Sequence, residues 1–308
     1  MHAWTDVAPL THIRSHPATA VWNGKIYVFG GGGPRFASLN TVEVYDPRVD
    51  RWDAAAPMPT LRSGAVTAVI GGRIFVVGGG FRKDDGKFRF LPTTEIYDPA
   101  SDTWAAGPDM LQPHDYPACA ELDGAIYILG GHHPDATEGG PSEDPGFNFC
   151  ERLAPGAGRW ERLADMPTPR FAPMGVTWRG RVWAVGGCAY SPEAGGVRDF
   201  DRIEVYDPAG GAWTTPGFSM PWPAAAHGVA RDGDTVYVIG GYSGPGIHAR
   251  AVRFNADSGK ARDLPSLGEP RAAMGTCIVD GRLYAIGGWR GDGRQVTNRV
   301  EALTLSGA

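Results

Sequence analysis

Six short apolar runs, each ending in a Gly-Gly pair, recur along the chain and decide its fold. They are KIYVFGG (25–31), RIFVVGG (73–79), AIYILGG (125–131), RVWAVGG (181–187), TVYVIGG (235–241) and RLYAIGG (282–288). The first glycines of successive pairs are 47 to 56 residues apart. Self-similarity at such a period is typical of a repeat architecture, in which one unit cannot bury its apolar face alone. The sequence therefore predicts six copies of one small unit.

A second signature follows three of the Gly-Gly pairs and marks the outer half of the unit. It reads VEVYDP (42–47), TEIYDP (94–99) and IEVYDP (203–208). In each case a tryptophan lies seven residues after the tyrosine, at Trp52, Trp104 and Trp213. Regular spacing of these aromatic residues indicates that they pack the units against each other.

The fifth and sixth units depart from this pattern. In the fifth, Phe254 and Ala261 stand where other units have tyrosine and tryptophan. The sixth unit ends soon after Glu301 without a tryptophan, whereas Trp4 lies near the start of the chain. We therefore expect the N-terminal strand to complete the last unit, because a closed ring leaves no unpaired sheet edge between its ends.

The Gly-Gly pair, the VE-x-YD-P segment and the spaced tryptophan together resemble the kelch repeat. The resemblance implies an all-β fold, a six-bladed kelch β-propeller with four antiparallel strands per blade, whose last blade is closed by the N-terminal strand. It also implies one domain over residues 1–308. In the second unit we expect the innermost strand A within 63–70, strand B at 74–79, strand C at 93–99 and the outermost strand D around Trp104.

Composition excludes several classes of protein. The chain of 308 residues contains 45 Gly and 26 Pro, yet 42% of it is hydrophobic, which favours many short strands with tight turns over disorder. The net charge of −5 gives no overall basic field for nucleic acid. No apolar run approaches ~18 residues, so no membrane helix is expected. Four cysteines without paired spacing and the absence of a signal-like N-terminus favour the cytoplasm.

The loop that enters each inner strand carries the main candidates for a binding site. The six aligned positions are Arg14, Arg62, His114, Arg170, Ala224 and Arg271. Guanidinium groups recognise carboxylate or phosphate in a bidentate manner, so a ring of them indicates an anionic ligand. In kelch modules that bind acidic peptides an arginine lies in a similar context, which Arg62-Ser63-Gly64 matches. The alternative is that these arginines bind backbone carbonyls between neighbouring blades.

Aromatic and polar residues are expected around the same mouth of the central channel. On the inner wall they are His16, Tyr116 and His227, and on the loops after the Gly-Gly pairs they are Arg82, His132, Tyr190, Tyr242, Trp289 and Arg290. Aromatic faces with a few polar groups are typical of a small-molecule site. The alternative is that the loop aromatics only pack against each other.

Catalysis and metal binding have weaker support. The local cluster His114, Asp115 and Tyr116 is the best candidate for acid–base work. No metal site is expected, because the histidines lack a ligand spacing; His16, His114 and His227 are the candidates if one exists. No cofactor is expected.

These observations predict a binding protein that recognises an anionic small molecule or an acidic peptide at the channel mouth. One alternative is a sugar-acid epimerase or mutarotase, an isomerase resembling the N-acetylneuraminate epimerase found among stand-alone bacterial kelch propellers. A second alternative is a metal-dependent enzyme that uses the histidines at the mouth. We expect no nucleic-acid or membrane partner, and a closed propeller requires no oligomer.

Overall fold

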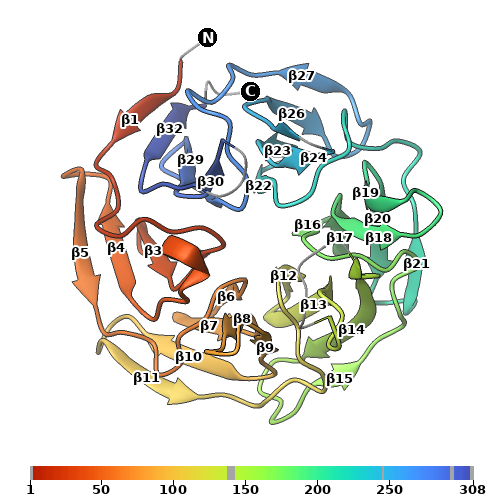
Figure 1. Ribbon diagram of the computed structural model, residues 1–308, viewed down its shortest axis with the longest axis horizontal. Coiled ribbons are helices and arrows are strands. Elements are labelled where there is room, and N and C mark those ends of the chain that lie inside the picture. The colour runs from red at the N-terminus through yellow and green to blue at the C-terminus, as the bar shows by residue number, and fades with distance from the viewer. Residues whose placement is uncertain (1–2, 137–142, 245, 292–294, 306–308) are drawn as a thin grey trace.

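The chain folds into six β-sheets arranged radially about one axis (Figure 1). The computed structural model describes residues 3–136, 143–244, 246–291 and 295–305. Within these residues there are six four-stranded antiparallel sheets, which confirms the predicted all-β, six-bladed propeller. Strands A of neighbouring blades contact each other around the axis, so strand A is innermost as expected.

Each blade contains strands A to D in order from the axis outward. Blade one comprises β2 (Ala18–Trp22), β3 (Lys25–Phe29), β4 (Val42–Asp46) and β5 (Arg51–Ala55). Blade two comprises β6 (Val66–Ile70), β7 (Arg73–Val77), β10 (Thr94–Asp98) and β11 (Thr103–Ala106), and blade three comprises β12 (Ala118–Leu122), β13 (Ala125–Gly131), β14 (Phe147–Leu153) and β15 (Glu161–Arg162).

The second half of the chain repeats this order. Blade four comprises β16 (Met174–Trp178), β17 (Arg181–Val185), β20 (Ile203–Asp207) and β21 (Ala212–Thr214), and blade five comprises β22 (Gly228–Asp232), β23 (Thr235–Ile239), β26 (Ala251–Asn255) and β27 (Ala261–Asp263). Blade six comprises β28 (Gly275–Val279), β29 (Arg282–Ile286), β32 (Val300–Thr304) and β1 (Thr5–Val7).

The last blade is closed by the N-terminal strand, as predicted. Strand β1 pairs with β32 in antiparallel register, with Thr5 opposite Ala302 and Val7 opposite Val300. The Trp4 indole donates a hydrogen bond to the Pro265 carbonyl (2.8 Å). The ring therefore joins its two ends through hydrogen bonds rather than through a covalent connection.

The repeated tryptophans form hydrogen bonds between neighbouring blades. Each one contacts the segment that follows strand D of the preceding blade. Their indole N–H groups donate to backbone carbonyls, in the pairs Trp52–Ala8, Trp104–Ala56, Trp160–Pro108 and Trp213–Ala164. Blade five lacks this contact because it has Ala261. There the Phe218 ring lies 6.2 Å from Phe254 and occupies the space beside Gly259.

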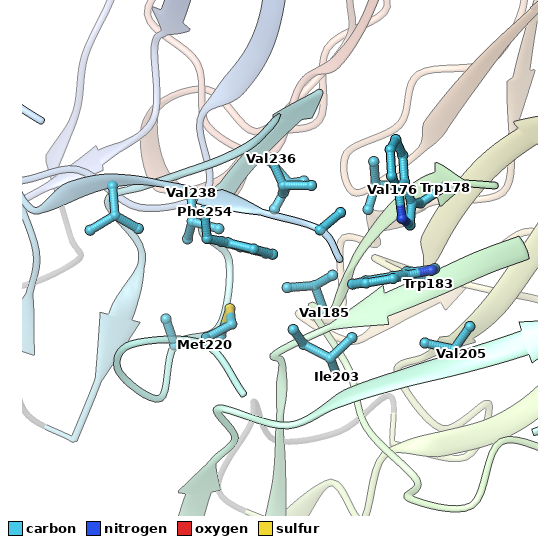
Figure 2. Packing of buried hydrophobic residues seen from close by; sticks show 14 of the residues in the cluster. Val176, Trp178, Trp183, Val185, Ile203, Val205, Met220, Val236, Val238 and Phe254 are labelled. Atoms are coloured by element: carbon cyan, nitrogen blue, oxygen red, sulfur yellow. The ribbon is translucent and has the colours of Figure 1, made fainter. Parts of the chain in front are cut away.

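Figure 2 shows the apolar core between blades four and five, with Trp178, Trp183 and Phe254 among its residues. A surface groove of about 740 Å³ runs beside this core and is lined in part by Trp178, Trp183 and Phe218. The groove lies where the regular tyrosine–tryptophan pair is missing from the repeat.

The loops between strands B and C contain structure that the sequence did not predict. Four of them form a small hairpin: β8 (Gly80–Arg82) with β9 (Phe88–Phe90), β18 (Cys188–Ser191) with β19 (Gly196–Asp199), β24 (Tyr242–Ser243) with β25 (Gly246–Ile247), and β30 (Trp289–Arg290) with β31 (Gln295–Val296). Blade one has a short 3-10 helix, η1 (Pro34–Phe36). Among the described residues no helix is long and apolar enough to cross a membrane, and the four cysteines are free.

Candidate functional site

The B–C loops and the D–A loops share one face of the propeller, here called the loop face. Isolated β-bridges join the two kinds of loop in five blades: Ser15–Gly32, Ser63–Gly80, Phe171–Cys188, Ala225–Tyr242 and Ala272–Trp289. The Gly-Gly pairs allow this close approach, since a Cβ on Gly30 would lie 2.4 Å from the Arg62 carbonyl oxygen. Side chains from two separate segments of each unit therefore meet on the loop face.

The arginine ring lies inside the blades and not at the mouth. Arg14 is fully buried, its guanidinium contacts the Glu43 carboxylate, and it donates to the Gly30 carbonyl (2.7 Å). Arg62, Arg170 and Arg271 repeat this arrangement, with Glu95, Glu204 and Glu301 as their partners. This corrects the expectation that the four arginines face a ligand, because all four guanidinium groups are buried and paired with a glutamate. The bonds lie within each blade, not between blades as the structural alternative held.

Blades three and five vary this buried pair. In blade three His114 replaces the arginine: Nδ1 lies 2.6 Å from the Gly130 carbonyl oxygen and Nε2 lies 3.0 Å from the Glu151 carboxylate, with both side chains buried. Blade five has Ala224 and Val252, so both charges are absent. His114 is therefore a structural residue, which removes it from the proposed ligand, catalytic and metal sets.

His227 is also enclosed. It is fully buried, and neither ring nitrogen has a hydrogen-bond partner among the described residues. Burial lowers the pKa of His227 to about 3, which keeps the ring neutral. It packs between blades four and five, where a Cβ on Gly186 would lie 2.7 Å from its Cε1. The sequence analysis expected His227 at the channel mouth, as a ligand-binding residue and a candidate metal ligand. Its burial corrects this expectation.

A ring of six backbone hydrogen bonds surrounds the axis. Each N–H donates to the carbonyl of the equivalent residue in the preceding blade, over 2.7 to 3.2 Å, through His16, Gly64, Tyr116, Ala172, Ala226 and Ala273. All six residues have φ between 50° and 67°. This left-handed conformation is uncommon for residues other than glycine, and here the surrounding hydrogen bonds hold it.

Aromatic side chains gather above this ring. The His16 ring lies 4.8 Å from Tyr116 and 4.4 Å from Trp289, both edge to face, and Phe36 lies 5.7 Å from Trp289. Burial, followed by the charge of His132, lowers the pKa of His16 to about 3, so this imidazole is neutral. Tyr242 packs on the same apolar cluster as Tyr116 and Trp289.

Asp115 is the acid of this region, and its nearest charged partner is distant. Its side chain is only 13% exposed. The His132 Nε2 lies 3.8 Å from Asp115 Oδ2. Burial raises the pKa of Asp115 to about 6, although the nearby His132 acts in the opposite direction. Asp115 is therefore a carboxyl group poised to take up or release a proton near neutral pH.

His132 is held rigidly beside Asp115. Its Nδ1 lies 2.6 Å from the buried Asp144 carboxylate, and its ring stacks on Phe171 at 4.4 Å and on Phe90 at 5.8 Å. Burial alone lowers the pKa of His132, but the hydrogen bond to Asp144 and the charge of Asp115 outweigh it, so the pKa is raised. We call the group of His16, Asp115, Tyr116, His132 and Trp289 the axial cluster.

The remaining predicted residues lie farther out or have other partners. Tyr242 Oη lies 3.2 Å from Cys188 Sγ, and Arg290 pairs with Glu269 at 3.2 Å. Arg82 is exposed and donates to the Gly86 carbonyl of its own hairpin (3.1 Å). Tyr190 is half-buried, and its N–H donates to the Asp144 carbonyl. In the part of the chain that the structure describes, no three His, Cys, Asp or Glu side chains converge as metal ligands.

Charge is uneven across the loop face. The B–C loops of blades one and two carry five basic side chains against two acidic ones; the basic side chains, here called the basic arc, are Arg35, Arg82, Lys83, Lys87 and Arg89. The described parts of the B–C loops of blades three and four carry six acidic side chains against two basic ones. One side of the loop face is therefore basic although the chain as a whole is acidic.

Apolar side chains accompany the basic arc. Of the five exposed large hydrophobic residues among those described, four lie on loop-face segments of blades one to three: Ile13, Phe36, Leu61 and Leu111. Their exposed fractions range from 37% to 48%. Exposed apolar groups beside charges of one sign are typical of a surface that contacts another protein.

Comparison with known proteins agrees with the repeat. The kelch motif matches residues 13–59, 61–111 and 270–306. Alpha-scruin of Limulus polyphemus is 27% identical over 81% of this chain, and kelch-like protein 23 of Homo sapiens is 26% identical over 65% of it. The chain spans about a quarter to a third of the length of these two relatives. The solved structure of YjhT has the same fold, with a TM-score of 0.77 and 17% identity over 95% of each chain.

Proposed function

Because the chain is a kelch-repeat β-propeller, we propose that it is a binding protein whose loop face takes up an acidic protein segment. The observation that carries this proposal is the basic arc with its flanking apolar residues. A partner with acidic and aliphatic side chains matches both properties of this surface. Complementary charge gives specificity and speeds association, while the apolar contacts add affinity.

The residues proposed to bind the acidic segment lie on the exposed loops. They replace the four buried arginines that the sequence analysis had suggested. Arg82 and Lys83 project from the hairpin of β8 and β9, and Arg35 lies in η1 of the neighbouring blade. The Arg82 guanidinium contacts the Arg35 carbonyl at 3.4 Å, so these two loops adjoin. An extended acidic segment can therefore contact both loops at once.

The sugar-acid isomerase is supported less well. Asp115 and His132 form an acid–base pair, which such an enzyme needs. However, the buried arginines are not available to hold the carboxylate of a sugar acid. The cations left for that role, such as Arg35 and Arg82, lie on the exposed rim.

Charge reversal tests the proposed function. In an Arg82→Glu/Lys83→Glu variant we expect binding of a short synthetic peptide of Glu and Leu residues to weaken by roughly tenfold or more, because attraction becomes repulsion. Binding is measured by titration calorimetry at two salt concentrations, and the wild-type affinity should fall with added salt. A peptide with Lys in place of Glu serves as the control ligand.

An Arg159→Glu/Arg262→Glu variant is the matched control, since it has the same net charge and both residues are exposed on other surfaces of the propeller. It should bind the acidic peptide about as tightly as the wild type does. If both double variants lose affinity equally, or if neither does, the basic arc is not the binding surface.

A further inference from the structure

The Asp115 carboxylate lies where a side chain would be expected at one position in the ring of six backbone hydrogen bonds. At five of the six ring positions a side chain is present, but blade two has Gly64. A Cβ built on Gly64 would lie 2.3 Å from Asp115 Oδ1. Asp115 therefore reaches across from blade three and places its carboxylate where a side chain at position 64 would lie.

This arrangement leaves a negative charge at the axis that the protein does not neutralise fully. His132 approaches Asp115 at 3.8 Å, but its own short hydrogen bond goes to Asp144. The titratable groups that interact with Asp115 are His132 and Asp144 from blade three and the adjacent Tyr116. His16 from blade one interacts in turn with His132. Two carboxyl groups, Asp115 and Asp144, therefore share one imidazole, that of His132.

The surroundings of the charge are aromatic. Tyr116 and Trp289 are half-buried, and each contacts the neutral His16 ring edge to face. Aromatic faces around a carboxylate attract an organic cation through both charge and cation–π contact. A hydroxyl group would supply a hydrogen bond but no compensating charge, and an anion would be repelled.

We propose that the axial cluster binds a small organic cation, a primary or methylated ammonium group, with Asp115 as its counter-charge and Tyr116 and Trp289 as its aromatic walls. His16 and Tyr116 belong to the ring of six backbone hydrogen bonds, which places the cluster at the axis. This site is separate from the basic arc and does not depend on the proposed binding of an acidic partner. The loop face then has two regions, one that binds acidic groups and one that binds a cation.

The test uses methylammonium and tetramethylammonium chloride as probes, with sodium chloride for ionic strength and sorbitol as a neutral hydroxylated compound. Binding is followed by chemical-shift changes of the Trp289 indole N–H and by thermal shift. We expect at least one ammonium probe to bind the wild type, and Asp115→Asn to weaken that binding at least tenfold. Trp289→Leu should weaken it by a smaller factor.

Asp109→Asn is the matched control, because Asp109 lies exposed in the same D–A loop and is not a member of the axial cluster. It should bind the ammonium probe like the wild type. Equal binding by wild type and Asp115→Asn, binding of sorbitol in place of both cations, or no binding of either cation would overturn the proposal. The acidic-peptide titration is unaffected by any of these results.

Discussion

The D–A loop that leads into strand A has different side-chain contacts in blade one and in blade five. In blade one, Arg14 and Glu43 form a buried ion pair, whereas blade five has Ala224 and Val252 at these positions. The main-chain bonds are the same in both: the Arg14 carbonyl accepts from Gly288 N–H, and the Ala224 carbonyl accepts from Gly187 N–H, each at 2.8 Å. The backbone therefore defines the loop, and the ion pair is an addition to it.

Blade five lacks both the buried carboxylate and one of the N–H groups that donate to it in blade one. Glu43 also accepts hydrogen bonds from the N–H groups of Thr11 (2.6 Å) and His12 (3.2 Å). The position equivalent to Thr11 in blade five is Pro221, which has no N–H. A buried ion pair is strongly destabilising only when one partner is lost, while its replacement by apolar groups is often close to neutral.

The largest effect should follow from leaving one buried charge alone. Glu43→Ala removes the partner of Arg14, and we expect it to destabilise the protein by about 3–5 kcal/mol. Urea denaturation at neutral pH measures this as a lower midpoint with an unchanged slope. Asp53→Ala, on the exposed face of the neighbouring strand β5, is the control and should change stability little. A Glu43→Ala variant as stable as this control would show that the pair is dispensable.

A smaller effect should follow from copying blade five. The double variant Arg14→Ala/Glu43→Val removes both charges, and we expect a loss of about 1–2 kcal/mol, mainly from the cavity that the smaller side chains leave. The same urea titration gives the value. Should the double variant prove less stable than Glu43→Ala, the comparison between the blades would fail.

The smallest effect concerns the stability of the fold at low pH. Burial alone raises the pKa of Glu43, but Arg14 and the N–H of Thr11 outweigh it, so the folded-state pKa is lowered. The resulting stabilisation is present above the pKa of the unfolded chain, about 4.3, and is lost as the pH falls through the folded-state value. Between pH 7 and pH 3 the wild type should therefore lose more stability than the double variant. Equal losses would contradict this assignment.

The repeat made the fold predictable in detail. Spacing of the Gly-Gly pairs gave six blades, and the position of Trp4 gave the closure through β1. The recurrence of glutamate with arginine, and their joint absence at Ala224 and Val252, was also visible in the sequence. That joint loss is the signal that each Arg–Glu set forms a pair, because an unpaired buried charge is costly.

The axial cluster was predictable only in part. The repeat placed His16 and Tyr116 at one level of the axis, since both follow the aligned arginine position by two residues. His132 and Asp144 are twelve residues apart in the sequence, and this His and Asp do not recur in the other units, so no periodicity indicated their contact. The role of Gly64 required the structure, because a missing side chain carries no chemistry of its own.

The ring of six backbone hydrogen bonds also determines what the axis does to a charge. Peptide dipoles aligned along a helix add up and give its ends partial charges. Here the six N–H groups all donate in the same direction around a closed circle, so the components of their dipoles along the circle cancel. Unlike a helix, this ring therefore has no terminus with unpaired N–H or C=O groups at which an ion could bind.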